Sequence, residues 1–381
     1  MRKYDTMEIK TVVISITVVI GALLTVIFLA AGAFLTPTYL EPWDQHYSDK
    51  FDDPRMKVIS HGLLAANSHN MQAWKVKLDE KDNMSFYLYM NADRLNLDVD
   101  PYARQSTFSQ GTFLEYVKVA GSKLGYDVDI NLFPEGEYNN TKQSIESKPV
   151  AKVTLKKTEA VNTPLYSSIF LPDTSRVAYT NKNLTEDQIN QIQALNEDGV
   201  SIVVYQDPEN NTRLGNIAVE SAKIEANMDT INEGNNKLFR GNEYQKNQYR
   251  YGFSMEGQGS SGLQMYFMEG LLSLIPSLND EKSSKERFIN QTQNEVDNTP
   301  TYVLIITKNN NRTSQVKAGM LYSHFQLNVQ TMGFAVQPLS QSLEEYPEMK
   351  EEYEKIHQQR TRRINHSITG KSRRTNNERF S

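Results

Sequence analysis

The chain has 381 residues, enough for one large or two ordinary domains that bury a hydrophobic core without covalent crosslinks. It contains no cysteine, which excludes disulfides, thiolate zinc sites, iron–sulfur clusters and cysteine nucleophiles. Lys and Arg number 41 against 46 Asp and Glu, so the net charge of −5 predicts no specific binding of nucleic acid.

The N-terminal region contains an uncharged apolar run from Thr11 to Leu35. About 20 apolar residues suffice to cross a bilayer as a helix, so the run predicts a transmembrane helix that is retained as a signal-anchor. One alternative is a buried core helix, but core helices rarely lack charge on every face. The other is a cleaved signal peptide, whose apolar segment is usually shorter.

Charge on either side of the run predicts its orientation. Basic residues lie within residues 1–10, before the run, and acidic residues crowd the segment that follows it. Cytoplasmic segments next to a membrane span carry an excess of Lys and Arg. We therefore expect a single-pass protein of the cell membrane with a cytoplasmic N-terminus and an extracytoplasmic main domain.

After the run, residues 36–54 are rich in Pro, Asp and Tyr and are interpreted as a linker. From Pro54 to about Pro347 helical and strand patterns alternate, with a helix expected at Arg55–Ala66 and strands at Lys75–Leu78 and Ser85–Met90. Such alternation predicts an α+β layered domain. Residues 348–381 are charged and, from Arg360 onward, basic, and we expect a disordered, solvated tail.

An internal similarity organises the folded part. Gly111–Gly125 and Gly319–Gly333 have the same length, and apolar or small residues fall at matching helical positions. Each ends in Gly, which tolerates the left-handed conformation found at helix C-termini. Strand-like segments, Phe86–Met90 and Tyr302–Thr307, precede them. We interpret these segments as two copies of one unit, and chance similarity between two amphipathic helices is the alternative. The two halves are residues 55–165 and 166–347.

The histidines and glycines carry no strong motif for metal or dinucleotide binding. His61 and His69 are the only close pair of histidines and are interpreted as structural or surface groups, so no metal site is expected. Gly257–Gly262 matches Gly-x-Gly-x-x-Gly, but it follows a polar stretch rather than an apolar strand. We expect a loop or lid there.

A polar run follows the first helix of the folded part, with Asn67, Ser68, His69, Asn70 and Gln72 in six positions before Trp74. Short polar side chains at such a place commonly cap a helix and form a turn. The carboxamides of Asn70 and Gln72 also suit a flavin, because an amide offers a donor and an acceptor to ribityl hydroxyls or to the pyrimidine edge. Both interpretations stay open.

Asn67–Trp74 (NSHNMQAW) resembles the Pro-Ser-Ser-His-Asn-x-Gln-Pro-Trp segment of nitroreductases, specifically of the Acg-like branch of FMN-binding nitroreductase-like proteins. Other stretches resemble that branch in the same order, namely Asp93-Arg94, Asp98–Arg104, Arg176–Tyr179 with Leu184-Thr185, and Gln337–Gln341. The chain departs from the pattern at four positions, where the family's Pro, Ser, Pro and Arg are replaced by Ala66, Asn67, Ala73 and Tyr179.

The resemblance implies a nitroreductase-like fold that is pseudo-duplicated in one chain, equivalent to a fused dimer in a monomer. It also implies that the cofactor is FMN. Asn67, Ser68 and Asn70 would then contact the flavin, and Arg176 would meet its phosphate. The other candidates for cofactor binding are His69, Gln72, Arg104 and Gln341, of which the last three could instead hold a turn or a carboxylate.

The expected function is that of a membrane-anchored, FMN-dependent oxidoreductase that passes electrons through flavin N5 to a nitro, quinone or similar small-molecule acceptor. No catalytic side chain is assigned. Because NAD(P)H is cytosolic and the main domain is expected outside, the electron donor is either NAD(P)H with a reversed orientation or a membrane or protein donor. The alternatives are a protein that binds or sequesters flavin without turnover and a surface interaction module without cofactor.

Overall fold

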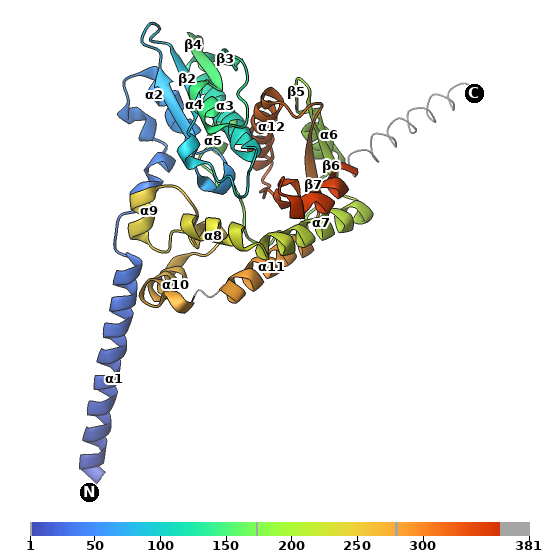
Figure 1. Cartoon of the computed structure of the whole chain (residues 1–381). Coiled ribbons are helices and arrows are strands. Elements are labelled where there is room, and N and C mark those ends of the chain that lie inside the picture. The colour runs from blue at the N-terminus through green and yellow to red at the C-terminus, as the bar shows by residue number, and fades with distance from the viewer. Residues whose placement is uncertain (1, 173, 279–280, 359–381) are drawn as a thin grey trace. The chain divides into compact units, whose positions relative to one another are not determined.

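The computed structural model describes residues 2–172, 174–278 and 281–358 (Figure 1). It is a mixed α+β structure whose chain divides into two compact units. The anchor unit holds the residues up to Glu41 together with Asn236–Ser284. The main unit holds Pro42–Asn235 together with the chain from Lys285 onward.

The anchor unit begins with helix α1, Arg2–Ala31. Within it, Ile9–Ala31 is long and apolar enough to cross a membrane, and no part of its most apolar window is buried. The hydroxyls of Thr17 and Thr25 donate to carbonyl oxygens four residues back, which satisfies these two polar groups within the helix. The helix starts earlier than the predicted run and ends four residues sooner, because Gly32 adopts a left-handed φ of +75°.

Two short helices follow in the second segment of the anchor unit, α9 at Glu243–Tyr249 and α10 at Gly262–Leu274. The expected linker at residues 36–54 contains two 3₁₀ turns, η1 at Thr38–Trp43 and η2 at Tyr47–Lys50. The linker therefore has local structure that its composition did not predict.

The main unit contains a four-stranded antiparallel sheet in the order β1-β2-β4-β3. The strands are β1 (Trp74–Leu78), β2 (Ser85–Met90), β3 (Tyr126–Leu132) and β4 (Ala151–Lys157). Both strands predicted in this region are confirmed to within one residue. Four helices belong to the same part of the chain, α2 (Pro54–Gly62), α3 (Arg104–Leu124), α4 (Lys142–Ser147) and α5 (Pro164–Ser168).

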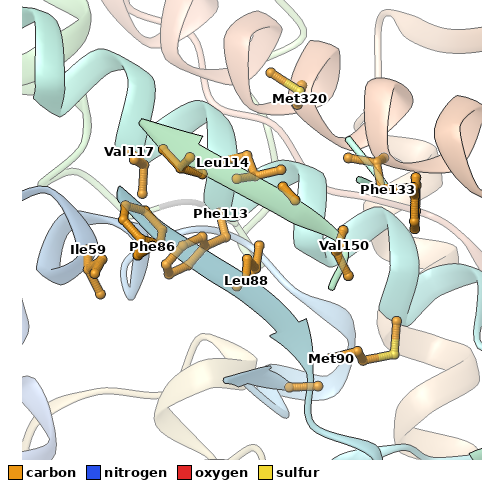
Figure 2. Packing of buried hydrophobic residues seen from close by; sticks show 14 of the residues in the cluster. Ile59, Phe86, Leu88, Met90, Phe113, Leu114, Val117, Phe133, Val150 and Met320 are labelled. Atoms are coloured by element: carbon orange, nitrogen blue, oxygen red, sulfur yellow. The ribbon is translucent and has the colours of Figure 1, made fainter. Parts of the chain in front are cut away.

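Helix α3 packs on one face of this sheet, and their side chains form the larger hydrophobic core (Figure 2). Phe86 and Leu88 of β2 meet Phe113 and Leu114 of α3, and all four side chains are fully buried. Helix α2 comes close to α3 at Gly62, where a Cβ atom would lie 2.4 Å from the Phe113 ring. Asp53 caps α2 by accepting a hydrogen bond from the Arg55 amide, with Pro in the first turn, so the start of α2 follows from local sequence.

A second, three-stranded antiparallel sheet has the order β5-β6-β7. Its strands are β5 (Asn196–Glu197), β6 (Val200–Tyr205) and β7 (Tyr302–Thr307), and it packs with α6 (Glu186–Ala194) and α12 (Arg312–Thr331). A capping box formed by Thr185 and Gln188 starts α6. Strand β7 has the predicted bounds. Between β6 and β7 the chain inserts α7 (Pro208–Ala226), α8 (Asp229–Leu238), the two short helices of the anchor unit and α11 (Glu281–Asp297).

Helices α3 and α12 cross at two glycines. A Cβ atom at Gly111 would lie 1.9 Å from the Val316 carbonyl oxygen, and one at Gly319 would lie 2.0 Å from the Phe108 carbonyl oxygen. Gly319 lies 208 positions after Gly111, and Val316 lies 208 positions after Phe108. The two contacts therefore join the same two equivalent positions, with the roles of the two helices exchanged. Each helix is followed by a glycine with a φ of +81°, Gly125 and Gly333, which confirms the predicted stops.

Residues 350–358 are helical, and Glu352 within them is buried. The expectation of a disordered tail is therefore wrong for residues 350–358, because Met349 packs into a hydrophobic cluster with Val99, Ile231 and Tyr346. The rest of the expected tail, residues 359–381, lies outside the described residues.

Candidate functional site

The loop that follows α2 has an unusual backbone. His69, Asn70 and Gln72 adopt left-handed φ values of +51°, +50° and +48°. Each such conformation costs a non-glycine residue on the order of 1 kcal/mol and persists only where the surroundings impose it. Strain of this kind clusters at ligand sites, so the loop is a candidate site on backbone geometry as well as on composition.

The side chain of Asn67 imposes this geometry. Its Oδ1 accepts a hydrogen bond from the Gln72 amide at 2.8 Å, and its Nδ2 donates to the Ala65 carbonyl at 3.2 Å. Gln72 Nε2 donates to Asn70 Oδ1 at 3.2 Å. Asn67 therefore has the turn-forming role, and the flavin interpretation of Asn70, which is exposed, stays a prediction.

A second constrained segment lies at the start of α3, where Ala103 has a φ of +51°. Asp100 is only 5% exposed and accepts hydrogen bonds from the amides of Gln105 and Ser106 and from the Ser106 hydroxyl. Asp100 of the Asp-Pro motif therefore satisfies free amides in the first turn of α3, although the N-cap residue of the helix is Ala103.

Three hydrogen bonds connect the two constrained segments. The Ser68 amide donates to Ser109 Oγ at 3.0 Å, and Ser68 Oγ donates to Gln105 Oε1 at 3.2 Å. Trp74 Nε1 donates to the Ser109 carbonyl at 2.9 Å. Motifs that were separate in the sequence therefore meet at the first turns of α3.

The C-terminal segment joins them through η7, Gln341–Leu343. The guanidinium of Arg104 donates to the Leu343 carbonyl, and its Nε lies 3.2 Å from Glu345 Oε2. Gln105 Nε2 donates to Glu344 Oε1 at 3.5 Å. Of the two roles considered for Arg104, the structure shows the structural one, in which it holds a turn and a carboxylate.

Two buried carboxyl groups lie next to these residues, Glu225 of α7 and Glu344, which are 7% and 3% exposed. Burial raises the pKa of Glu225, although Asn235, Gln341 and Arg176 lower it in part. Burial and the charge of Glu225 also raise the pKa of Glu344 well above its usual value. At neutral pH the pair is therefore partly protonated.

Several acceptor atoms at this place make no well-formed hydrogen bond with the described residues, although Asn235 and Gln341 lie within reach of Glu225, and Tyr346 and Gln105 within reach of Glu344. They are Glu225 Oε2, Glu344 Oε2 and Asn235 Oδ1, and all three are buried. A buried acceptor without a donor costs roughly 1–3 kcal/mol and calls for an explanation such as a bound ligand or water. Gln341, another predicted site residue, lies beside Glu225.

Arg176 lies close enough to the loop and to Glu225 for its charge to act on both. Burial lowers the pKa of His69, Asp100 raises it in part, and the charge of Arg176 lowers it further. Burial raises the pKa of Glu225, and the charge of Arg176 lowers it in part. The side chain is half-buried and makes no hydrogen bond or ion pair with any residue that the structure describes. The guanidinium is therefore free to meet an anion.

Sequence reasoning missed Glu225, Glu344 and Tyr346. A signal for Glu225 exists, because it continues the buried stripe of α7 formed by Leu214, Ala218 and Ser221 at helical spacing. A carboxyl group on such a stripe is unusual and points to a partner or a function. Glu344 and Tyr346 lie in an irregular segment, where no periodicity marks burial.

The remaining candidates have structural surroundings. His61 Nδ1 lies 2.8 Å from the Lys57 carbonyl and its Nε2 lies 3.0 Å from the Tyr166 hydroxyl. Across the described ranges, no group of three or more His, Cys, Asp and Glu side chains is arranged to hold a metal. Gly257–Gly262 begins within the short turn η5, Glu256–Gln258, and ends at the first residue of α10, so it does not follow a strand.

No protein-family model matches the chain, and no curated protein matches it in sequence. The nitroreductase resemblance therefore depends on the sequence motifs of this chain.

Proposed function

We propose that the main unit is a pseudo-duplicated, nitroreductase-like domain that binds one FMN between the Asn67–Gln72 loop, the start of α3 and Arg176. The protein would act as an oxidoreductase anchored in the cell membrane by α1, with a cytoplasmic N-terminus and an extracytoplasmic main unit. The observation that carries the proposal is the meeting of a strained polar loop, an unpaired guanidinium and buried acceptors without donors.

The crossing of α3 and α12 supports the duplication. In a twofold-symmetric contact, residue i of one copy touches residue j of the other copy, and residue j of the first copy touches residue i of the second. Gly111 meets Val316 and Gly319 meets Phe108 in this way. A helix, two paired antiparallel strands and a helix also recur, as α2-β1-β2-α3 and as α6-β6-β7-α12. The second half differs in having the additional strand β5 before β6 and the long insertion between β6 and β7.

The chemistry of the unpartnered groups matches a flavin nucleotide. Ribityl hydroxyls and the N3–H of the flavin ring are donors, which buried carboxyl and amide oxygens require. A phosphate accepts a forked pair of hydrogen bonds from a guanidinium such as that of Arg176. Asn67 and Arg104 already use their polar atoms within the protein, so they would position the loop rather than contact the cofactor.

The two buried carboxyl groups set a condition on this proposal. As anions, Glu225 and Glu344 would repel a phosphate in a site of low dielectric constant. Their raised pKa values keep protons on the pair, which removes the repulsion and adds a hydroxyl donor. Binding should therefore be tightest where these groups are protonated.

Bound FMN would supply the electron transfer, and the side chains would bind it, orient it and exclude water. Asn70 and Ser68 would orient the ring, Arg176 would hold the phosphate, and Glu344 would keep a proton within the site. No side chain is required as a general acid or base. The donor is NAD(P)H or a membrane or protein donor, and the acceptor is a small nitro compound or quinone.

The test starts with the full chain purified in detergent. We expect the visible absorption bands of an oxidised flavin, or saturable uptake of added FMN with about one flavin per chain. Colourless protein that takes up no FMN would overturn the proposal. Oxidation of NADH, NADPH or a quinol with a nitroaromatic or quinone acceptor then separates an enzyme from a protein that binds flavin without turnover.

A further inference from the structure

Helix α10 packs against α1 with direct backbone contact (Figure 1). A Cβ atom added at Gly270 would lie 2.1 Å from the Ile27 carbonyl oxygen and 2.7 Å from Ile27 Cγ2. Helices approach this closely only where one of them presents a glycine, as in packed helices within membranes. The position of α10 is therefore tied to a defined level of α1.

That level is the end of the apolar span. Ile27 lies four residues before Ala31, which corresponds to about 6 Å along the helix axis. The 23-residue segment Ile9–Ala31 is about 35 Å long as a helix, slightly more than the roughly 30 Å of a bilayer's hydrocarbon core. With α1 inserted, Ile27 and the α10 backbone that touches it lie at the boundary between hydrocarbon and headgroups.

The surface of α10 suits that boundary. Between Gly257 and Leu278 the only charged residue is Glu269, and Glu269 is fully buried. Large apolar side chains point away from the anchor unit instead, with Leu263 75% exposed and Leu274, Ile275 and Leu278 each nearly half exposed. Phe34 and Leu35, just beyond the end of α1, are exposed as well.

The charge of Glu269 is compensated inside the anchor unit. Its Oε1 lies 3.2 Å from Nζ of Lys246 in α9, and Nζ lies 2.6 Å from Glu243 Oε1. This cluster holds the polar side of α10 against α9. The exposed side carries Leu263 and Leu274 together with the uncharged polar Gln264, so it presents large apolar side chains and no charged group.

We propose that α10 and the turn that follows it, residues 262–278, form a second membrane contact that inserts its exposed apolar side chains into the leaflet in which α1 ends. The proposal rests on the membrane insertion of α1. A bilayer is the occupant favoured here because α10 contacts α1 at Ile27, within the apolar segment, so the exposed apolar side chains of α10 belong to a helix that touches the expected span. The contact would fix the anchor unit at the membrane surface instead of leaving it tethered by one helix.

The absence of cysteine allows a direct test with single-cysteine variants of the full chain. Leu274→Cys and Ile275→Cys place an environment-sensitive fluorophore on the proposed contact. Gln248→Cys, on the exposed side of α9, is the aqueous control, and Val18→Cys, in the middle of α1, is the membrane control. Each labelled protein is reconstituted in phosphatidylcholine and phosphatidylglycerol vesicles, with and without nitroxide-labelled lipid.

We expect lipid nitroxides near the headgroups to quench roughly half of the fluorescence at positions 274 and 275, with iodide in water having little effect there. Nitroxides deep in the chains should quench position 18, and iodide should quench position 248. If iodide quenches 274 and 275 as strongly as 248 while 18 stays in lipid, α10 lies in water and the proposal fails, whereas the anchor stands.

Two further outcomes would also overturn the proposal. Labels at 274 and 275 that neither iodide nor lipid nitroxide reaches would mean that a second protein surface, such as another copy of the chain, covers α10. A label at position 18 that lipid does not quench would mean that α1 is not inserted. Flavin absorption of the same samples reports on the main unit separately, so the loss of one proposal is distinguishable from the loss of the other.

Discussion

Each unit of the molecule contains a cluster of buried acidic side chains, and the two clusters differ in what compensates them. In the anchor unit, Glu243 and Glu269 lie within ion-pair distance of Lys246, whose side chain is 4% exposed. In the main unit, Glu225 and Glu344 form no ion pair with any described residue, and the nearest cation, Arg176, acts on Glu225 only through its field.

The difference separates a structural cluster from a candidate binding site. A buried carboxylate is tolerated when a cation offsets part of the cost of removing it from water, and the ion pairs of Lys246 do this in the anchor cluster. A buried carboxyl group without a cation holds a proton instead, and its free acceptor atoms stay available to a ligand. Both effects act on Glu269 in the anchor cluster, since burial raises its pKa to about 7 although Lys246 opposes the shift.

The largest effect should come from removing the cation of the anchor cluster. Lys246→Met leaves Glu243 and Glu269 buried together without compensation, and breaking a buried pair in this way costs about 3–5 kcal/mol. We expect hydrogen exchange at the α9 and α10 amides of the full chain to accelerate strongly. Lys237→Met, an exposed lysine of α8, is the matched control and should change stability by less than about 0.5 kcal/mol. Equal exchange in the two variants would mean that the cation does not stabilise the cluster.

The next effect concerns the cation of the main unit and should appear in binding rather than in stability. Arg176→Ala removes a guanidinium that has no partner in the protein, so the thermal midpoint should change little. Hydrogen bonds to a charged group contribute about 1.5–3 kcal/mol, so FMN affinity measured by fluorescence titration should fall roughly 10- to 100-fold. Arg213→Ala on α7, where Arg213 pairs with the exposed Glu209, is the control and should bind FMN as the native chain does. A large loss of stability in Arg176→Ala would show that Arg176 serves the fold.

The smallest effect is a dependence of stability on pH, which the buried pair Glu225 and Glu344 should cause because no cation pairs with it. Because the folded pKa values of Glu225 and Glu344 are raised above their unfolded values, their contribution to stability is complete below the usual carboxyl pKa and is lost as the pH rises through the folded values. Glu225→Gln keeps the shape without the ionisation and should flatten this decline, with a change at acidic pH of less than about 1 kcal/mol.

Urea unfolding of the full chain at acidic and at mildly alkaline pH measures this decline. Glu220→Gln, on the exposed side of the same helix and paired with Lys223, is the control and should keep the native pH slope. If Glu225→Gln declines with pH as steeply as the native chain, the buried pair does not titrate in the expected range.

The local elements were largely readable from sequence. The strands at Lys75–Leu78, Ser85–Met90 and Tyr302–Thr307 show β-rich composition between turn residues, and glycines mark the ends of α3 and α12, so short-range sterics suffice to predict them. The apolar helix α1 also follows from composition alone, apart from its end at Gly32, where the backbone of a single residue decides.

Only the tertiary structure decided which polar side chains form hydrogen bonds within the protein and which distant segments they join. The sequence alone did not determine whether Arg104 serves a cofactor or a turn, because its partner, Leu343, lies 239 residues away. It did not indicate that Glu225, within an insertion, would join Glu344, nor that Gly270 would meet Ile27. Periodicity reports which face of an element is buried, whereas the partner of that face depends on contacts between distant segments, which the chain forms only on folding.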